Sequence, residues 1–384
     1  MKRHVLLGLC GALLGGVTAL AQGPLLPPGA SPQATQDPGY AALIAMCKTP
    51  PATGARPGGG GRPGGAAAGG NRAGAGARPG GAAPAQAPAA FPPKPADYTV
   101  TAIPGVIAGG QKWTKVWEVS GNNADGVLSE KKDGGDLLIA QNHNSAVVKL
   151  DKNGKASTAY KDTHTGGALS MNSKGQLFIV ERGLHSNVTQ LAPKRQVLAD
   201  KLPNGDPLDC LGGVINDLTA DSRGGVYFTM GGLFYASPNG VVTRYGEGLN
   251  TNGVILSPDE KTLYVTNGAF GGPGTIAAFD VKDDGSLANQ REFVRLPAGG
   301  GDGLTVDSEG RLYVTAGPNL VVVDKGGKVL GSIPAPYGLI SAAFAGKDKK
   351  TVYAVVSLSD STRLQHAFVY SIPMLAQGYK GRAK

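Results

Sequence analysis

The 384-residue sequence has few of the residues on which several common active sites depend. Its five histidines show no HExxH or other short paired spacing, and its three cysteines show no zinc-binding pattern. It has no GxSxG nucleophile elbow, and its glycine-rich strings lack both a phosphate-loop lysine-serine ending and a strand-to-helix dinucleotide setting. These absences argue against a zinc hydrolase, a serine-nucleophile hydrolase and a nucleotide-binding enzyme.

Long hydrophobic runs are also scarce, and the first residues carry the clearest one. Lys2 and Arg3 precede an apolar stretch that ends on Ala19-Leu20-Ala21, with small residues at both cleavage-determining positions. This pattern predicts a signal peptide over residues 1–21 and a secreted or periplasmic protein. No later segment approaches the ~20 apolar residues of a spanning helix, so we expect a soluble mature protein with no membrane span.

Large apolar residues are nearly missing from residues 22–97, which are dominated by Gly, Ala and Pro. Such a composition cannot bury a core, so it predicts a disordered low-complexity leader. Arg-Gly-Gly tracts of this kind can bind RNA, but in an exported chain a flexible, weakly cationic spacer is the simpler interpretation.

The remainder of the chain repeats one pattern six times: a short apolar run, a polar turn and a second apolar run. Each copy is typical of a β-hairpin, and the spacing between copies suits a four-stranded propeller blade. The sequence therefore predicts an all-β fold, a six-bladed β-propeller over residues 98–379, followed by a basic tail at 380–384. The segments VTQL, LFYA, IAAFDV and LVVVD are the predicted third strands, and Trp113 to Val119 is expected to pair with the last blade and close the ring.

The net charge of +9 is unevenly distributed. The signal carries +2, the leader +4 and the rest +3, which matches Lys380, Arg382 and Lys384. A nearly neutral propeller argues against a nucleic-acid partner. Only Cys47 and Cys210 remain after signal cleavage, and a disulfide, a buried thiol and a loose thiol are all open for them.

The first residue of each copy falls in an equivalent position, where the strand that lines the propeller axis begins. We call these six positions the mouth ring, because they would surround the mouth of the central channel: Asp125, Gly167, Asn216, Asn252, Asp302 and Ser341. Four of them offer carboxylate or carboxamide oxygens, which suit calcium better than zinc. Turn formation explains the same residue types at strand starts equally well.

The second strand of each hairpin returns to the same rim. Its last residues form a second set, in which Glu181 is the one acid and Asn267 a polar neighbour. Arg182 could neutralise Glu181 as a surface pair, or Glu181 could take part in catalysis. His143 and His164 are expected in loops near this face.

Three segments, NDLTADSRGGVYFT, NGVILSPDEKTLYVTN and DGLTVDSEGRLYVT, resemble the corresponding segments of the SMP-30/gluconolactonase family. The resemblance runs from about Gly121 to Ser357. It implies a six-bladed propeller with a divalent metal, often calcium, at the channel mouth, and in many members hydrolysis of sugar-acid lactones. Position by position, it implies Asn252 and Asp302 as metal ligands, Asp125 as the acidic ligand of the first blade, and Asn216 as a ligand or substrate contact.

The chain departs from the family pattern at three places. Asp125-Gly126-Val127 stands where the family usually has Glu-Gly-Pro. Val214 stands where the family often has Arg, two residues before the Asn of the third blade, and Met230 replaces the usual Asp after the YFT strand. These changes bear on metal affinity and on the substrate.

The resulting hypothesis is a metal-dependent hydrolase that opens a sugar-acid lactone, or a related ester, at the channel mouth. Asp302 is the first candidate for the general base and Glu181 the second. Asn216, His143 and Asn267 are candidate substrate contacts. The alternative is a non-catalytic, metal-pinned propeller that binds a protein or a glycan at the cell surface, and a third possibility is another reaction at the same site.

Overall fold

The computed structural model describes residues 37–49, 90–94, 97–268, 273–297 and 299–384. The predicted signal peptide and most of the predicted leader lie outside the described residues. Within the described ranges, no helix is long and apolar enough to cross a membrane.

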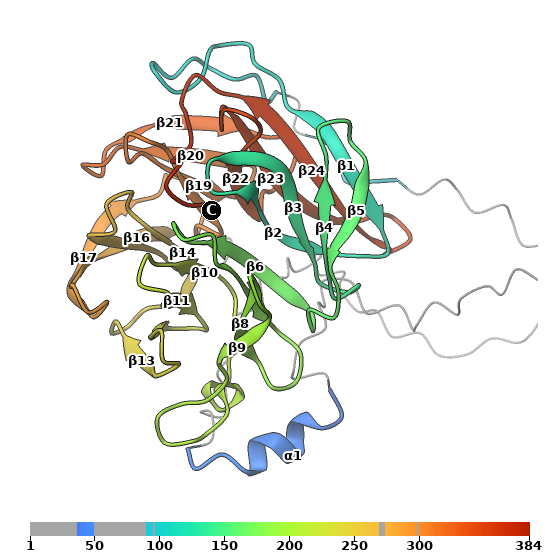
Figure 1. Ribbon diagram of the computed structural model, residues 1–384. Helices are drawn as coiled ribbons and strands as arrows, with labels where there is room; N and C mark the ends of the chain where they lie inside the picture. Colours follow the sequence, from blue (N-terminus) through green and yellow to red (C-terminus); the bar gives the residue numbers. More distant parts are fainter. Residues whose placement is uncertain (1–36, 50–89, 95–96, 269–272, 298) are drawn as a thin grey trace, which may run out of the picture.

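The described strands form six four-stranded antiparallel sheets around a central axis, which confirms the predicted six-bladed β-propeller (Figure 1). Blade 1 is β2 Ala124–Lys131, β3 Gly134–Gln141, β4 Ala146–Leu150 and β5 Ala156–Tyr160; blade 2 is β6 Gly166–Met171, β7 Leu177–Glu181, β8 Asn187–Ala192 and β9 Gln196–Ala199; blade 3 is β10 Leu218–Ala220, β11 Val226–Thr229, β12 Leu233–Ala236 and β13 Val242–Tyr245. Blade 4 is β14 Thr251–Leu256, β15 Thr262–Gly268, β16 Gly274–Val281 and β17 Leu287–Arg295; blade 5 is β18 Leu304–Val306, β19 Leu312–Ala316, β20 Asn319–Val323 and β21 Val329–Pro334.

Blade 6 joins the two ends of the propeller. It consists of β22 Ser341–Ala345, β23 Thr351–Ser359, β24 Gln365–Pro373 and, as its outer strand, β1 Thr114–Ser120 from the start of the domain. The predicted closure by this early segment is therefore confirmed. The Trp113 indole N–H donates to the Pro334 carbonyl at 2.8 Å, which anchors the start of β1 to the neighbouring blade 5.

The core lies between the faces of successive blades, because the inner strands are buried on both sides. Every residue of β7, β11 and β19 is buried, and these strands are rich in Val, Leu, Ile, Phe and Tyr. Burying such a side chain contributes roughly 1.5–3 kcal/mol. The alternation expected for a half-exposed sheet is absent from these three strands for the same reason.

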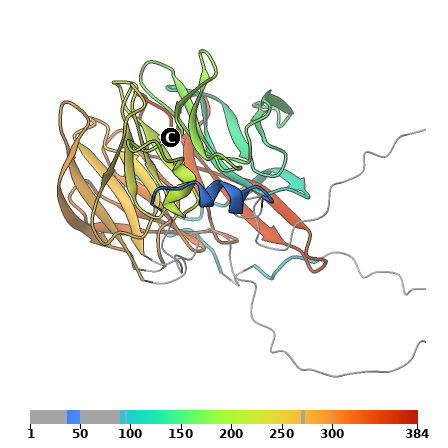
Figure 2. The ribbon, with the colours of Figure 1, turned by 90° about the horizontal axis from the view of Figure 1, so that it is seen from below.

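Two segments outside the blades are tied to them. Helix α1, Tyr40–Ala45, lies outside the ring (Figures 1 and 2), and Cys47 just after it forms a disulfide with Cys210 of the short 3-10 helix η2, Leu208–Leu211. Of the three states open for these cysteines, the structure has the bridge. Residues 37–49 thus differ from the disordered leader expected there. The disulfide links them covalently to the propeller.

A buried aspartate organises the first turn of blades 3 and 5. Asp307 accepts hydrogen bonds from the main-chain N–H groups of Glu309 and Arg311, both at 2.9 Å. Its other oxygen accepts from the Arg311 Nε at 2.6 Å and from the Tyr313 hydroxyl at 2.8 Å. Asp221 likewise binds an arginine and a tyrosine from different positions of its blade, Arg223 in the turn and Tyr235 on the third strand, β12. The DSxG segments of the sequence therefore serve the fold.

We expect Asp307→Asn to lower the free energy of unfolding by about 2–4 kcal/mol. The substitution removes the negative charge that pairs with Arg311, and an amide nitrogen cannot accept the hydrogen bonds of Arg311 and Tyr313. Asp324→Asn is the matched control. Asp324 accepts the same kind of turn hydrogen bonds, from Gly326 and Lys328. Urea denaturation measures both variants, and equal midpoints would contradict the role given to the Arg311 and Tyr313 contacts.

Candidate functional site at the channel mouth

Local strand geometry points the mouth ring toward the axis. In blades 3 and 5 regular pairing begins just after the ring residue, and the main-chain N–H groups of Asn216 and Asp302 donate to the Thr229 and Thr315 carbonyls, both at 2.8 Å. In blades 1, 2 and 4 the pairing register shifts at the ring residue, as in a β-bulge, between Ala124 and Val127, Gly166 and Leu169, and Thr251 and Val254. Bulges of this kind redirect side chains next to functional sites.

Neighbouring blades approach closely at this level. A Cβ on Gly253 would overlap the main-chain oxygen of Asp302, so only glycine fits beside Asn252. The Thr229 hydroxyl donates to the Asn252 carbonyl of the next blade, and the Thr315 hydroxyl donates to the Ile340 carbonyl at 3.0 Å. The glycine next to the ring residue in the sequence is therefore explained by close packing.

Arg182 lies at the centre of the contacts around the mouth ring. It follows β7 and is buried, with 6% of its surface exposed. Its Nη1 forms an ion pair with Asp125, and its Nη2 donates to the Asn216 side-chain oxygen at 2.8 Å and to the Asn216 carbonyl at 2.7 Å. Its Nε donates to the Ile215 carbonyl at 2.9 Å. Among the described ion pairs, Arg182 pairs with Asp125 and Glu181 pairs with Arg195, and a pair between Arg182 and Glu181 is not among them.

Two asparagines lie between Arg182 and Asp302 in the network of contacts. The Asn216 amide donates to the Asn252 side-chain oxygen at 2.9 Å, and the Asn252 side chain interacts with the Asp302 carboxyl group, which lowers the pKa of Asp302. Burial raises the pKa of Asp302 well above its usual value, and the nearby Asp125 and Asp217 carboxylates add to the rise. The structure thus brings together the four residues predicted as metal ligands: Asp125, Asn216, Asn252 and Asp302.

A second buried cation lies beside the mouth ring and comes from the tail segment, residues 378–384. Figure 1 marks the C-terminal end of the chain at the centre of the ring of blades. The Lys384 ammonium pairs with Asp217 at 2.6 Å and donates to the Leu218 and Val254 carbonyls at 2.6 and 2.5 Å. Burial raises the pKa of Asp217, and Lys384 opposes the rise. The basic residues of the tail are therefore partly inside the propeller.

Two further side chains, those of Arg382 and Lys349, hold the tail segment in place. Arg382 donates to the Ser257 carbonyl at 3.0 Å, and its second terminal nitrogen donates to the Leu256 carbonyl. The buried Lys349 ammonium donates to the Tyr379 and Arg382 carbonyls at 2.7 and 2.9 Å. The segment is thus part of the folded domain.

The other predicted site residues, Glu181, Asn267 and His143, make the following described contacts. Glu181 is buried, pairs with Arg195 and accepts from the Asn187 amide at 3.3 Å. Asn267 accepts from the Asn250 N–H at 2.9 Å. His143 follows β3, and its main-chain N–H donates to the Asn122 side-chain oxygen at 3.0 Å.

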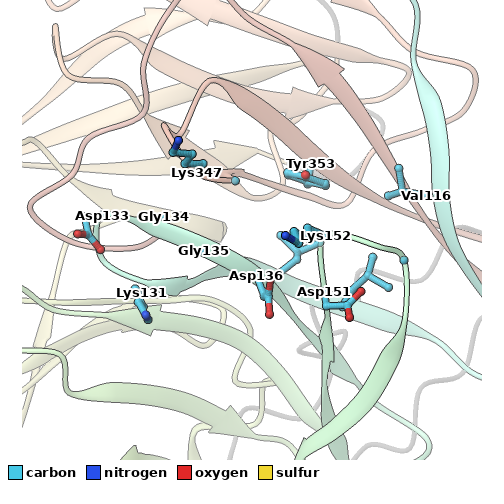
Figure 3. A pocket seen from close by; sticks show the side chains of 14 residues that line it. Val116, Lys131, Asp133, Gly134, Gly135, Asp136, Asp151, Lys152, Lys347 and Tyr353 are labelled. Atoms are coloured by element: carbon cyan, nitrogen blue, oxygen red, sulfur yellow. The ribbon is translucent and has the colours of Figure 1, made fainter.

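A pocket of about 590 Å³ lies at the end of the blades opposite to the mouth ring (Figure 3). Asp133 of the β2–β3 turn, Gly134 at the start of β3 and Lys347 of the β22–β23 turn are among its lining residues. Asp125 stands at the opposite end of β2. This pocket carries no convergent set of buried polar groups, so we place the candidate site at the mouth ring.

The oxygens of the ring are hard ligands of the kind that calcium accepts, but most of them are already engaged. Asp125 and Asn216 bind the Arg182 guanidinium, and the Asn252 oxygen accepts from Asn216. No cluster of three or more His, Cys, Asp or Glu residues that could hold a metal ion occurs in the described part of the chain. As arranged, the ring does not fit a divalent cation beside Arg182.

Comparison with known proteins identifies the class. Residues 124–357 match the family described as the SMP-30/Gluconolactonase/LRE-like region. The match spans more than half of the chain, and the protein belongs to this family. The resemblance noted in the repeat segments is thereby confirmed.

Individual relatives match over shorter stretches. The lactonase drp35 of Staphylococcus haemolyticus is 27% identical over 212 residues, which cover 50% of this chain and 57% of that protein. A gluconolactonase of Zymomonas mobilis is 29% identical over 170 residues, 37% of this chain and 48% of that protein. The lactonohydrolase oryH of Aspergillus oryzae is 32% identical over 126 residues, 27% of each chain. The match therefore spans between about a quarter and somewhat over half of these curated relatives.

Solved structures support the fold. A gluconolactonase from Xanthomonas campestris aligns with a TM-score of 0.59 at 21% identity, over 75% of this chain and 98% of that one. A calcium-binding protein, regucalcin, from Agrobacterium tumefaciens aligns with a TM-score of 0.53 at 14% identity, over 70% of this chain and 97% of that one.

Sequence reasoning missed Arg182, Asp217 and Lys384 as parts of this site. One signal was available for Asp217, because it follows the ring residue of blade 3 where blades 1, 4 and 5 have glycine. The sequence offers Glu181 as one possible partner of Arg182, whereas the described ion pair of Arg182 is with Asp125 of another blade. Nothing local in the sequence connects Lys384 to a residue 167 positions earlier.

We expect Lys384→Met to lower the free energy of unfolding by about 3–5 kcal/mol, because it keeps an apolar stem but leaves the Asp217 carboxylate buried without its cation. Lys380→Met is the control, since Lys380 is exposed in the same segment. Thermal and urea unfolding of both variants measure the difference. Equal stability of the two would contradict the role of the Lys384–Asp217 pair.

Proposed function

We propose that the protein hydrolyses a lactone ring, of a sugar acid or a related ester, at the mouth of its central channel. Family membership and relatives named lactonase, gluconolactonase and lactonohydrolase support this class of reaction. At the level of single residues, the proposal rests on Asp302, a buried acid of the mouth ring. Among the described ion pairs, Asp125 pairs with Arg182 and Asp217 with Lys384, whereas none includes Asp302.

In this mechanism Asp302 is the general base. Its carboxylate takes a proton from a water molecule as the water oxygen attacks the lactone carbonyl. During the attack, negative charge develops on the carbonyl oxygen of the lactone. The Arg182 guanidinium provides positive charge near this oxygen. The ring C–O bond then breaks, and the departing oxygen takes the proton back from Asp302, which yields the open hydroxy acid.

The remaining polar residues have supporting roles in the proposal. Asn252 orients Asp302 in this proposal, and Asn216 holds Asn252 through the hydrogen bond between their side chains. His143 and Asn267, at the ends of β3 and β15, are the proposed contacts to substrate hydroxyl groups. Glu181 is the less favourable candidate base, because it pairs with Arg195 and lies outside the described contacts of the mouth ring.

The family and the calcium-binding regucalcin suggest a divalent metal for this class of propeller. Calcium was the metal predicted for this chain, yet the engaged oxygens of the ring give no site for it beside Arg182. The proposed mechanism has no step through a metal, and the assays include metal ions and a chelator so that a metal requirement would be detected.

A panel of aldonolactones tests the proposal, with calcium, with other divalent ions and after chelation. We expect turnover of at least one lactone, and we expect Asp302→Asn to lower kcat by about 10²–10⁴-fold, the usual contribution of a general base. Glu181→Gln should keep most of the activity. Intact, folded protein without turnover under any of these conditions would overturn the proposal and favour the non-catalytic binding propeller.

We also propose that the chain is exported to an oxidising compartment, with residues 1–21 removed. The basic, apolar and Ala-Leu-Ala pattern of the first residues supports export, and so does the Cys47–Cys210 disulfide. Mass spectrometry of the native, unreduced protein is expected to give a chain that starts at Gln22 and a Cys47–Cys210 linked peptide. An uncleaved chain in which Cys47 and Cys210 are both free thiols would contradict both expectations.

A further inference from the structure

We infer that Arg182 supplies, as a fixed side chain, the positive charge that a divalent metal would supply at the mouth ring, so that the ring binds no divalent cation while Arg182 is in place. The inference rests on the proposed function only for its location, the mouth ring. It follows from the contacts that the Arg182 guanidinium makes with its neighbours.

Arg182 is held too firmly to be a mobile surface side chain. All three of its nitrogens are engaged: Nε and Nη2 donate to the main-chain carbonyls of Ile215 and Asn216, and Nη1 pairs with Asp125. The Asn216 side-chain oxygen adds a further acceptor at 2.8 Å. Two of the four oxygen donors predicted for a metal are thus the acceptors of this guanidinium.

The fold provides a dedicated space for this side chain. Gly167 is the ring residue of blade 2, and a Cβ at this position would lie 2.6 Å from the Arg182 Nη2 and closer still to Nε and Cζ. Blade 2 therefore contributes no side chain from its ring position. Arg182, which follows the second strand of the same blade, fills the place instead.

The charges around the mouth ring are compensated by the protein itself. Asp125, Asp217 and Asp302 bring three carboxylates, and Arg182 and Lys384 bring two cations that pair with the first two. A divalent ion on the Asp125 and Asn216 oxygens would lie beside the guanidinium, where like charges repel strongly in a poorly solvated site. Arg182 and a metal at these oxygens are therefore mutually exclusive.

The experiment measures metal binding without any lactone, so its result is independent of turnover. Isothermal titration with calcium, and then with manganese and zinc, is performed on the chelator-treated full chain. We expect no saturable site in the unchanged protein at millimolar calcium, the range of the weakest protein calcium sites. Arg182→Met is expected to gain one saturable calcium site per chain. Its affinity for calcium should exceed any weak binding by the unchanged protein at least about tenfold.

Two further variants make the test specific. Arg195→Met removes an arginine near the same rim that pairs with Glu181, and it should bind no more calcium than the unchanged protein. Gly167→Ala keeps Arg182 but places a methyl group in its space, so it should gain affinity as Arg182→Met does, even if the latter fails to fold.

One stoichiometric calcium ion bound by the unchanged protein, with the same affinity in Gly167→Ala or Arg182→Met, would overturn the inference. So would the absence of any calcium site in a folded variant of either kind. A failure of lactone hydrolysis with the expected binding pattern would instead count against the proposed reaction and leave the inference intact.

Discussion

The structure around the axis depends on the neutralisation of buried carboxylates. The closed ring of blades brings Asp125, Asp217 and Asp302 to one poorly solvated region, where a bare negative charge is costly. Arg182 and Lys384 pair with the first two of these acids. Because Lys384 comes from the tail segment and Arg182 from blade 2, the site depends on the whole propeller and on the segment that enters it.

The two cations differ in a way that matches their surroundings. Arg182 has a planar fork of donors, and it meets a carboxylate, a side-chain amide and two main-chain carbonyls that lie around it. Lys384 is a compact point charge, and it meets two carbonyls and one carboxylate at short distances. Exchange of the two residue types would leave acceptors unmet at one position and crowd the other.

The number of blades, the predicted strands and the closing strand could be predicted because each is recorded in a local pattern of apolar runs and turns. The convergence of Asp125, Asn216, Asn252 and Asp302 also followed from the repeat, since equivalent positions in a closed ring must meet. The direction of the Arg182 side chain could not be predicted. Successive residues of a strand point to opposite faces, and the register shift between Gly166 and Leu169 in the β6–β7 pair hides which face Arg182 occupies. The Asp217–Lys384 pair and the Cys47–Cys210 bridge join distant segments and have no local signal.

Departures from the repeat place additional charges around the axis. Blades 4 and 5 place an amide or an acid and then a glycine at the axis, which is what close packing requires. Blade 3 replaces that glycine with Asp217, and blade 2 replaces the ring side chain with the space that Arg182 fills. Each departure introduces a charge, and each charge is paired within the protein. Asp302 is left as the acid of the mouth ring that no described cation pairs with, and a carboxylate in that position is the group best able to exchange a proton with a bound molecule.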